Sequence, residues 1–449
     1  MQKPGRTKKV AVGFLVVAIL LIAFIGISTQ RRCNAEGDKD YEYIGLLTDV
    51  MAIVKKNYVE EVDSKKLIYG AINGMLAALD PHSSFMTPDT FKEMKIDTKG
   101  AFGGLGIEIS VKDGILTVIA PIEGTPAQRA GIKPGDQIVK IDDHFTKDLS
   151  ITDAVKRMRG PKGTKVVLTI MREGFDRPKE FTLLRDIVQV KSIKSQLLAG
   201  GYGYIRIVQF QERTDDDFAK ALKALSDENK GKPLAGLVLD LRNDPGGLLE
   251  QAVRVSDHFI PDGKLIVYTA GRDKESRMQF NASNRHKEPG YPLVVLINAG
   301  SASASEIVAG ALQDHKRAIV MGTQSFGKGS VQTIIPLSDG SGLRLTTARY
   351  YTPLGRSIQA KGITPDIVVD QIELPKAPVK RDILSVREKD LENHFEGDGK
   401  GDKPGSPKVT KPEKGEKQSA DLLQADYQLM RAVDLLKGWE ILKTYGQGK

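Results

Sequence analysis

Apolar residues fall into different patterns in successive stretches of this chain, and each pattern predicts a different kind of structure. The run from Val10 to Ser28 carries no charge. From Tyr41 to Lys95, apolar residues recur at helical spacing. Short strand-like runs separated by turns follow from Ala101, and longer apolar runs that alternate with helical patterns follow from Gly201. We therefore expect a multidomain α/β protein behind an apolar N-terminal segment.

The N-terminal segment has the length of a membrane span. Its uncharged run would cover about 28 Å as a helix, roughly the thickness of bilayer hydrocarbon. Basic residues precede it and favour a cytoplasmic N-terminus, although Arg31 and Arg32 add positive charge on the far side. No clean small-residue cleavage site ends the run. We expect an uncleaved signal anchor in the bacterial inner membrane, with the rest of the chain periplasmic or extracytoplasmic. A cleaved, secreted form remains the alternative.

Composition argues against several other classes of protein. Cys33 is the only cysteine, so no disulfide forms within the chain, and Gln30-Arg31-Arg32 does not suit the cleavage site of a lipid-modified cysteine. The net charge of +9 is spread out rather than gathered in basic runs with aromatic residues, which argues against nucleic-acid binding. No His, Asp and Glu cluster has metal-ligand spacing, and we expect no metal and no other cofactor.

Residues from Ala101 to about Val188 predict a small β-rich domain. The run Gly103-Gly104-Leu105-Gly106 opens it, and a helix predicted from Thr152 to Met158 ends at Arg159-Gly160. This order of strands, turns and helix resembles a PDZ domain. The resemblance implies that residues 103–106 hold the terminal carboxylate of a protein through free backbone amides, while its tail adds as a strand to the sheet edge. It also implies that Arg159 helps to couple tail binding to an ordered site elsewhere in the chain.

The stretch from Gly201 to Asp370 is predicted to be an α/β unit. Leu237 to Leu241 is a nearly continuous apolar run, as expected of a strand buried on both faces, and it ends in a turn that contains Gly246 and Gly247. Further strands are predicted at 266–268, 293–297 and 318–321, and helices at 215–226, 249–258 and 305–315.

Ser303 and Lys328 are the candidate reactive pair of this unit. Ser303 follows the strand 293–297 and stands at the start of a helix, among small residues that let a carbonyl group approach. The free amides at the start of that helix would face a developing oxyanion. Lys328 lies in Gly327-Lys328-Gly329 after the strand 318–321. A lysine can serve as the base for a serine if burial lowers its pKa.

The runs around these two residues resemble the motifs of the carboxy-terminal processing peptidases, which are tail-specific serine proteases that contain a PDZ domain. Residues 300–312 resemble their nucleophile motif and residues 322–332 their lysine motif, within a resemblance that extends from about Tyr41 to Asp370. The resemblance implies a ClpP/crotonase-like catalytic core with Ser303 as nucleophile and Lys328 as base. It also implies that Gln332 orients the lysine, and that Ala304 with Gly246 or Gly247 forms the oxyanion hole. The sequence does not choose between the two glycines.

Two rival interpretations of the sequence are a Ser-His-Asp triad and a non-catalytic scaffold. A Ser-His-Asp triad would need one of six histidines, and none of them sits in a glycine-rich turn of the expected site. A PDZ scaffold without catalysis, which only binds the C-termini of exported proteins, would be favoured by loss of Ser303 or Lys328, and both residues are present.

The C-terminal part carries two further segments. Residues 395–418 are rich in Gly, Pro, Lys and Glu with almost no apolar residues, which predicts a disordered linker. Residues 419–443 predict an amphipathic helix that docks on the core or pairs with a second subunit, so a homodimer formed through the terminal helices is left open. The expected parts are a signal anchor (1–32), an N-terminal helical segment (40–100), a PDZ domain (101–188), a serine protease domain (189–374), the linker and the helix.

Overall fold

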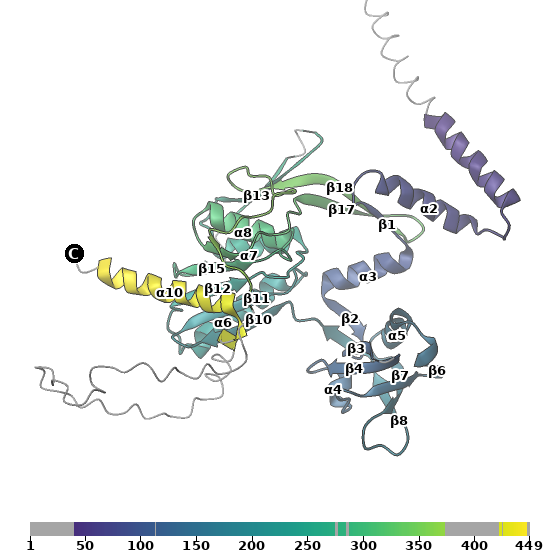
Figure 1. The fold of residues 1–449 in the computed structure, drawn as a ribbon, viewed down its shortest axis with the longest axis horizontal. Coiled ribbons are helices and arrows are strands. Elements are labelled where there is room, and N and C mark those ends of the chain that lie inside the picture. The colour runs from purple at the N-terminus through teal and green to yellow at the C-terminus, as the bar shows by residue number, and fades with distance from the viewer. Residues whose placement is uncertain are drawn as a thin grey trace, which may run out of the picture. The chain divides into compact units, whose positions relative to one another are not determined.

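The computed structural model describes residues 40–112, 114–273, 277–283, 287–372, 422–423 and 425–446 (Figure 1). The predicted signal anchor and the predicted linker 395–418 lie outside these ranges. Among the described residues, no helix is both long enough and apolar enough to cross a membrane.

From residue 40 onward, where its structure is described, the N-terminal unit contains two helices. Residues 40–57 are helical, and α2 runs from Ser64–Ala77. The Asp63 side chain accepts a hydrogen bond from the Lys65 amide at 2.8 Å and caps α2, which decides between Asp63 and Ser64 as the cap residue. β1 (Ser84–Met86) and α3 (Pro88–Lys99) follow, and Gly100 ends α3 with a positive φ of 66°.

The β-rich unit that follows is the part of the chain predicted to be a PDZ domain. A sheet of order β3-β4-β5-β7-β8, with β6 beside β5, packs around a core that includes Ile138, Leu168 and Ile170, and β2 pairs separately with β9. Because β9 is part of this pairing, the domain extends to Gln189. The elements are β2 (Ala101–Gly104), β3 (Ile107–Lys112), β4 (Ile115–Pro121), α4 (Pro126–Arg129), β5 (Gln137–Ile141), β6 (His144–Phe145), η1 (Thr146–Asp148), α5 (Ile151–Met158), β7 (Lys165–Met171), β8 (Lys179–Leu184) and β9 (Asp186–Gln189).

Six strands of the described chain form the central sheet of the α/β unit. Their order is β10-β11-β12-β15-β16-β19, and all neighbours are parallel except β10 and β11. The strands are β10 (Ile193–Leu198), β11 (Tyr202–Ile207), β12 (Gly236–Asp240), β15 (Leu293–Ile297), β16 (Ile319–Gly322) and β19 (Ile367–Val368).

Both faces of this sheet are covered. Leu237 and Leu239 point into one core with the helices α6 (Thr214–Glu228), α7 (Leu249–Asp257) and α8 (Ala304–Asp314). Val238, which lies between them, points into a second core with α10 (Tyr427–Gly446). β12 is therefore buried on both faces, as its continuous apolar run predicts, because successive side chains alternate between the two cores.

A second sheet carries part of the candidate site. β17 (Ser330–Pro336) pairs antiparallel with β18 (Gly342–Tyr351), which also pairs with β13 (Leu265–Gly271), and β13 pairs with β14 (Met278–Asn281). The sequence predicts only residues 266–268 of β13, and no pattern in the chain indicates the β17–β18 hairpin.

The C-terminal helix docks on the core. α10 runs from Tyr427 to Gly446, and its Leu429, Ala432, Val433 and Leu436 are buried against the sheet. Of the two expected alternatives, docking on the core is confirmed.

Candidate active site

Ser303 sits at a strained corner between β15 and α8. Its φ of 55° and ψ of −109° are unusual for a residue with a side chain. The residue is 8% exposed and stands directly before the first residue of the helix. Strain of this kind persists only where the surroundings fix it, and it is concentrated at functional sites.

The glycine turn after β12 approaches this corner closely. A Cβ atom on Gly246 would lie 2.9 Å from both Ser303 Cβ and the Ala304 nitrogen, and 2.6 Å from the Ala302 carbonyl oxygen. The φ of Gly246 is 95°, which also favours glycine. Only a residue without a side chain fits here, so the turn lies directly beside the nucleophile position.

The two glycines of the turn differ in their hydrogen bonding. The Gly246 amide donates to Asp244 Oδ1 at 2.8 Å. No described acceptor takes a hydrogen bond from the Gly247 or Ala304 amide. Burial raises the pKa of Asp244 to about 7, and the hydrogen bond from Gly246 opposes that shift. The structure therefore distinguishes the glycines, which the sequence does not.

Glu306 connects the start of α8, where Ser303 lies, to the loop that contains Lys328. This carboxylate is fully buried in the first turn of α8. Its Oε2 accepts hydrogen bonds from the Ser303 amide at 2.7 Å and the Lys328 amide at 2.9 Å. Its Oε1 accepts hydrogen bonds from the Gly327 amide at 2.7 Å and the Ser325 hydroxyl at 2.6 Å. Four donors converge on one side chain, which fixes the backbone of the two candidate residues, Ser303 and Lys328, relative to each other.

The surroundings of Lys328 disfavour its charged form. Burial lowers the pKa of Lys328, and the positive charge of Arg344 lowers it further. No described carboxylate forms an ion pair with its ammonium group. The side chain is half-buried rather than largely buried as predicted. A lysine that loses its proton near neutral pH can act as a base.

Gln332 and Tyr350 lie on the β17–β18 hairpin. The Gln332 side chain donates to the hydroxyls of Ser330 at 2.8 Å and Thr346 at 3.4 Å, and no hydrogen bond joins it to Lys328 in the described structure. Burial raises the pKa of Tyr350 to about 12, and a hydrogen bond with the Ser303 side chain opposes that shift. Tyr350 therefore contacts the candidate nucleophile, while the orienting role of Gln332 stays a prediction.

The serines on either side of Ser303 are engaged with the backbone. The Ser301 hydroxyl donates to the Leu241 carbonyl at 2.7 Å, and the Ser305 hydroxyl donates to the Asp244 carbonyl at 3.0 Å. Both residues are fully buried. They tie the start of α8 to the end of β12, whereas the helix-cap position belongs to Ser303 itself.

Two of the histidines weighed for a triad have other partners. His258 Nε2 lies 2.8 Å from Asp215 Oδ1, and His315 Nε2 lies 2.7 Å from the Leu265 carbonyl oxygen. These contacts hold α7 and α8 against neighbouring segments, as expected of structural histidines.

The PDZ domain carries a groove beside α5. A cavity of about 120 Å³ is lined by Leu105, Gly106 and Arg159, among others. The Leu105 and Gly106 amides donate to no described acceptor, so they are free to bind a carboxylate. Gly103 and Gly104 instead lie in β2, paired with β9. Of the residues 103–106 predicted to bind a tail, Leu105 and Gly106 therefore line the groove, and the tail-binding role stays a prediction.

Arg159 links this groove to α3. Its guanidinium forms an ion pair with Glu93 and lies 4.5 Å from the centre of the Phe102 ring. It also lines a second cavity of about 480 Å³ between α3 and the end of α5. Arg159 is therefore a bridging residue rather than a solvated charge at a helix end.

Several residues of the site escaped sequence reasoning. Glu306 is part of the nucleophile motif, and its position three residues after the N-cap residue is a capping-box signal that could have identified it. Arg344 and Tyr350 reach the site only through the β17–β18 pairing, which the sequence analysis does not predict.

The chain is similar to known proteins over most of its length. Residues 201–369 match Peptidase family S41, residues 117–172 match the PDZ domain, and residues 27–90 match the activating protease CtpB N-terminal domain. A carboxy-terminal-processing protease of Bartonella bacilliformis is 46% identical over 418 residues, which cover 93% of this chain and 95% of that protein.

More distant relatives carry related names. The carboxy-terminal processing protease CtpB of Bacillus subtilis is 36% identical over 349 residues, which cover 77% of this chain and 71% of that protein. Among solved structures, the photosystem II D1 C-terminal processing protease is 31% identical and covers 74% of this chain and 94% of that chain, with a TM-score of 0.43. With its PDZ domain and its peptidase domain, the chain belongs to peptidase family S41 and, within it, to the carboxy-terminal processing proteases.

Proposed function

We propose that this protein is an exported serine endopeptidase that captures the C-terminal tail of a protein substrate and cleaves near it with a Ser303/Lys328 dyad. The main support for the dyad is that one carboxylate oxygen of Glu306 accepts hydrogen bonds from the backbone amides of both residues. The lowered pKa of Lys328 supports its role as base.

The chemical steps follow from these positions. Neutral Lys328 Nζ takes the proton of Ser303 Oγ while Oγ attacks the scissile carbonyl carbon. The lysine then gives the proton to the leaving amine, and an acyl-enzyme remains. Water attacks the ester with Lys328 again as base, which releases the acid product and restores the serine. An unperturbed lysine would lie about three pKa units too high for this work, worth roughly 4 kcal/mol.

The oxyanion of the tetrahedral intermediate would be held by the Ala304 and Gly247 amides. We choose Gly247 over Gly246 because the Gly246 amide already donates to Asp244. Two backbone donors fixed before the reaction stabilise the developing charge without reorganisation. Gln332 would orient Lys328 through a rotation of its amide away from Ser330.

The PDZ groove would supply the selectivity for tails. The free amides of Leu105 and Gly106 would hold the terminal carboxylate, with the tail beside β3. Bound carboxylate would then compete with Glu93 for Arg159 and shift the domain toward an active arrangement.

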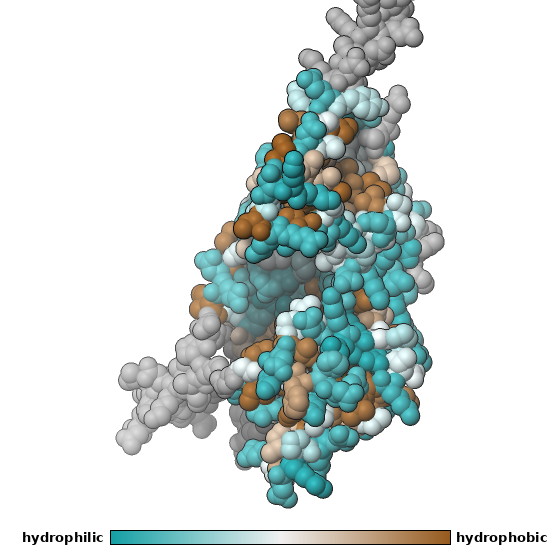
Figure 2. Space-filling model, turned by 90° about the vertical axis from the view of Figure 1, so that its right-hand side faces the viewer, coloured by the Kyte–Doolittle hydropathy of each residue, from teal (hydrophilic) through white to brown (hydrophobic). Residues whose placement is uncertain are grey.

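Location and assembly are also proposed. The uncharged run Val10–Ser28 supports an inner-membrane anchor with the peptidase on the extracytoplasmic side. A homodimer would cover apolar side chains that are exposed in this chain. They include Leu46 and Ile53 on helix 40–57 and Leu442 at the end of α10. Figure 2 shows one face of the molecule, on which apolar groups are scattered among hydrophilic residues.

A serine-directed fluorophosphonate probe tests the proposed function. The wild-type chain should be labelled at Ser303 and should cleave peptides with free C-termini, and Ser303→Ala should do neither. A non-catalytic PDZ scaffold would bind tails but would not be labelled. If the wild-type chain is not labelled, the scaffold interpretation replaces our proposal.

A further inference from the structure

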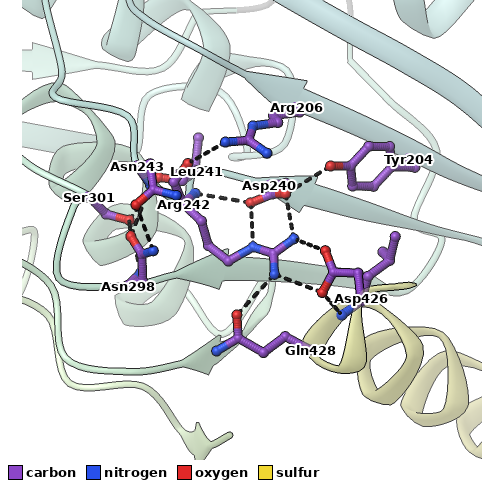
Figure 3. Close-up of polar contacts among 11 residues, drawn as sticks. Tyr204, Arg206, Asp240, Leu241, Arg242, Asn243, Asn298, Ser301, Asp426 and Gln428 are labelled. Carbon is purple, nitrogen blue, oxygen red and sulfur yellow. Dashed lines mark hydrogen bonds and ion pairs between the residues drawn. The ribbon is translucent and has the colours of Figure 1, made fainter. Parts of the chain in front are cut away.

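A cluster of buried charges joins the C-terminal helix to the strand that leads into the glycine turn (Figure 3). Arg242, two residues after the end of β12, is 6% exposed, and Asp240 is fully buried. Arg242 Nε donates to Asp240 Oδ1 at 2.9 Å, and Nη2 donates to Asp240 Oδ2 at 2.7 Å. On its other side, Nη1 and Nη2 donate to the two carboxylate oxygens of Asp426 at 2.9 and 2.6 Å.

The guanidinium has no unused donor. Its remaining N–H on Nη1 donates to Gln428 Oε1 at 2.9 Å, so all five N–H groups have acceptors. Burial disfavours the charge, but the hydrogen bonds that Arg242 donates to Asp240 and Asp426 outweigh it and raise the pKa of Arg242. Burial likewise opposes ionised Asp426, and Arg242 outweighs it and lowers the pKa of Asp426. Loss of either carboxylate would leave a buried charge partly unpaired.

The backbone at Arg242 is the start of the turn beside Ser303. The Arg242 carbonyl accepts a hydrogen bond from Arg206 at 3.2 Å. Its neighbour Asn243 has a φ of 56°, and its amide donates to Asn298 Oδ1 at 2.9 Å while Asn298 Nδ2 donates back to Asn243 Oδ1. The Ser301 hydroxyl holds the Leu241 carbonyl. The segment 241–243 is thus held on one side by Asn298 and Ser301, which lie just before Ser303. On the other side it is held by the ion pairs of the Arg242 side chain.

Asp426 lies far from this segment in the sequence. It precedes α10, accepts a hydrogen bond from the Leu429 amide at 3.1 Å, and stands beyond residue 369, where the match to the peptidase family ends. Gln428 adds a second tie, because its Nε2 donates to the Val369 carbonyl at 2.7 Å. The C-terminal helix therefore completes a polar cluster whose other members belong to the matched domain.

We infer that Asp426 is a positioning residue for the proposed active site, which acts through Arg242 on the glycine turn 243–247. The role rests on the proposed function of that turn. The competing explanation is that Asp426 only docks the helix, in which case any change that loosens α10 equally would have the same effect on catalysis.

Variants of the full chain separate the two explanations. Asp426→Asn keeps the shape but turns one acceptor into a donor that faces the guanidinium, and Asp426→Glu keeps the charge. Leu436→Ala is the matched control, because Leu436 is 2% exposed, packs on Gly236 of β12 and loosens the same helix without touching Arg242. Val433→Ala is a second control if Leu436→Ala fails to fold.

The readouts are kcat and KM on a free-acid peptide, thermal unfolding, and hydrogen–deuterium exchange of peptides that cover residues 241–248. We expect Asp426→Asn to lower kcat by about tenfold or more with little change in KM, and to speed exchange at 241–248. Asp426→Glu should recover part of kcat. The control should keep kcat within about twofold of wild type, even when its Tm falls by as much as that of Asp426→Asn or by more.

Equal losses of kcat in Asp426→Asn and the control, or unchanged exchange at 241–248 in Asp426→Asn, would overturn the positioning role. A wild-type chain that neither cleaves peptide nor labels at Ser303 would remove the proposed function instead. In that case the exchange comparison between Asp426→Asn and the control still decides whether Asp426 positions the turn.

Discussion

The backbone amides of Ser303 and Lys328 donate to the same oxygen atom, Glu306 Oε2, at 2.7 and 2.9 Å. The two residues are 25 positions apart in the sequence and come from different segments, one at a helix start and one before β17. A single buried carboxylate therefore sets their relative backbone position. This relationship motivates the first two predictions.

Ser303→Ala and Lys328→Ala should each lower peptidase activity by at least about a thousandfold, because the two groups act as one unit. The double variant should be no worse than either single variant. Steady-state kinetics on one peptide substrate checks this. Near-normal rates in Lys328→Ala, with loss of activity in a histidine variant, would instead support a triad.

Glu306→Gln should disturb both reactive residues at once. The substitution turns one acceptor oxygen into a donor that faces backbone N–H groups, and each buried donor left unsatisfied costs about 1–3 kcal/mol. We expect lower stability in urea and slow fluorophosphonate labelling. Ser325→Ala is the control, since it removes one of the four donors and leaves the carboxylate in place. Rapid labelling of Glu306→Gln would contradict the role of the shared carboxylate.

Ser301→Ala and Ser305→Ala should keep measurable activity. Each variant loses one hydrogen bond to a buried carbonyl, which costs roughly 1 kcal/mol of stability. Mass spectrometry of the probe-labelled protein should find the label on Ser303 alone. A label on Ser301 or Ser305 would move the nucleophile.

Arg344→Gln should shift the pH dependence of activity. The positive charge of Arg344 lowers the pKa of Lys328, so its removal raises that pKa and the base stays protonated to higher pH. The acidic limb of the kcat/KM profile should therefore move to higher pH. Arg349→Gln, on the same strand, is the control and should leave the profile in place. An unmoved limb in Arg344→Gln would indicate that another group sets it.

Amidation of a substrate's C-terminus should cut turnover, because the free amides of the PDZ groove would lose their carboxylate. Arg159→Ala should lower kcat while tail binding to full-length Ser303→Ala protein carrying the same change stays largely intact. Arg157→Ala is the control, since that side chain contacts His144 instead. Equal cleavage of amidated and free-acid peptides would show that the groove does not read the terminus.

The sequence by itself determined the local chemistry and the order of the parts. The strand predicted at 293–297 has the bounds of β15, and the continuous apolar run of β12 is buried on both faces. These features depend on neighbouring residues and on the alternation of side chains, so one stretch of sequence contains the needed information. The motifs around Ser303 and Lys328 likewise indicated the protein family to which the chain belongs.

Tertiary structure decided which residues meet. The choice between Gly246 and Gly247 depends on an Asp244 side chain that folds back onto one amide. Arg344 and Tyr350 approach the site only because β18 pairs with β17, and Asp426 reaches Arg242 across 184 positions of sequence. Such contacts arise from the pairing and packing of distant segments, and the free energy of desolvating their charges depends on that packing, so no local pattern in the chain reveals them.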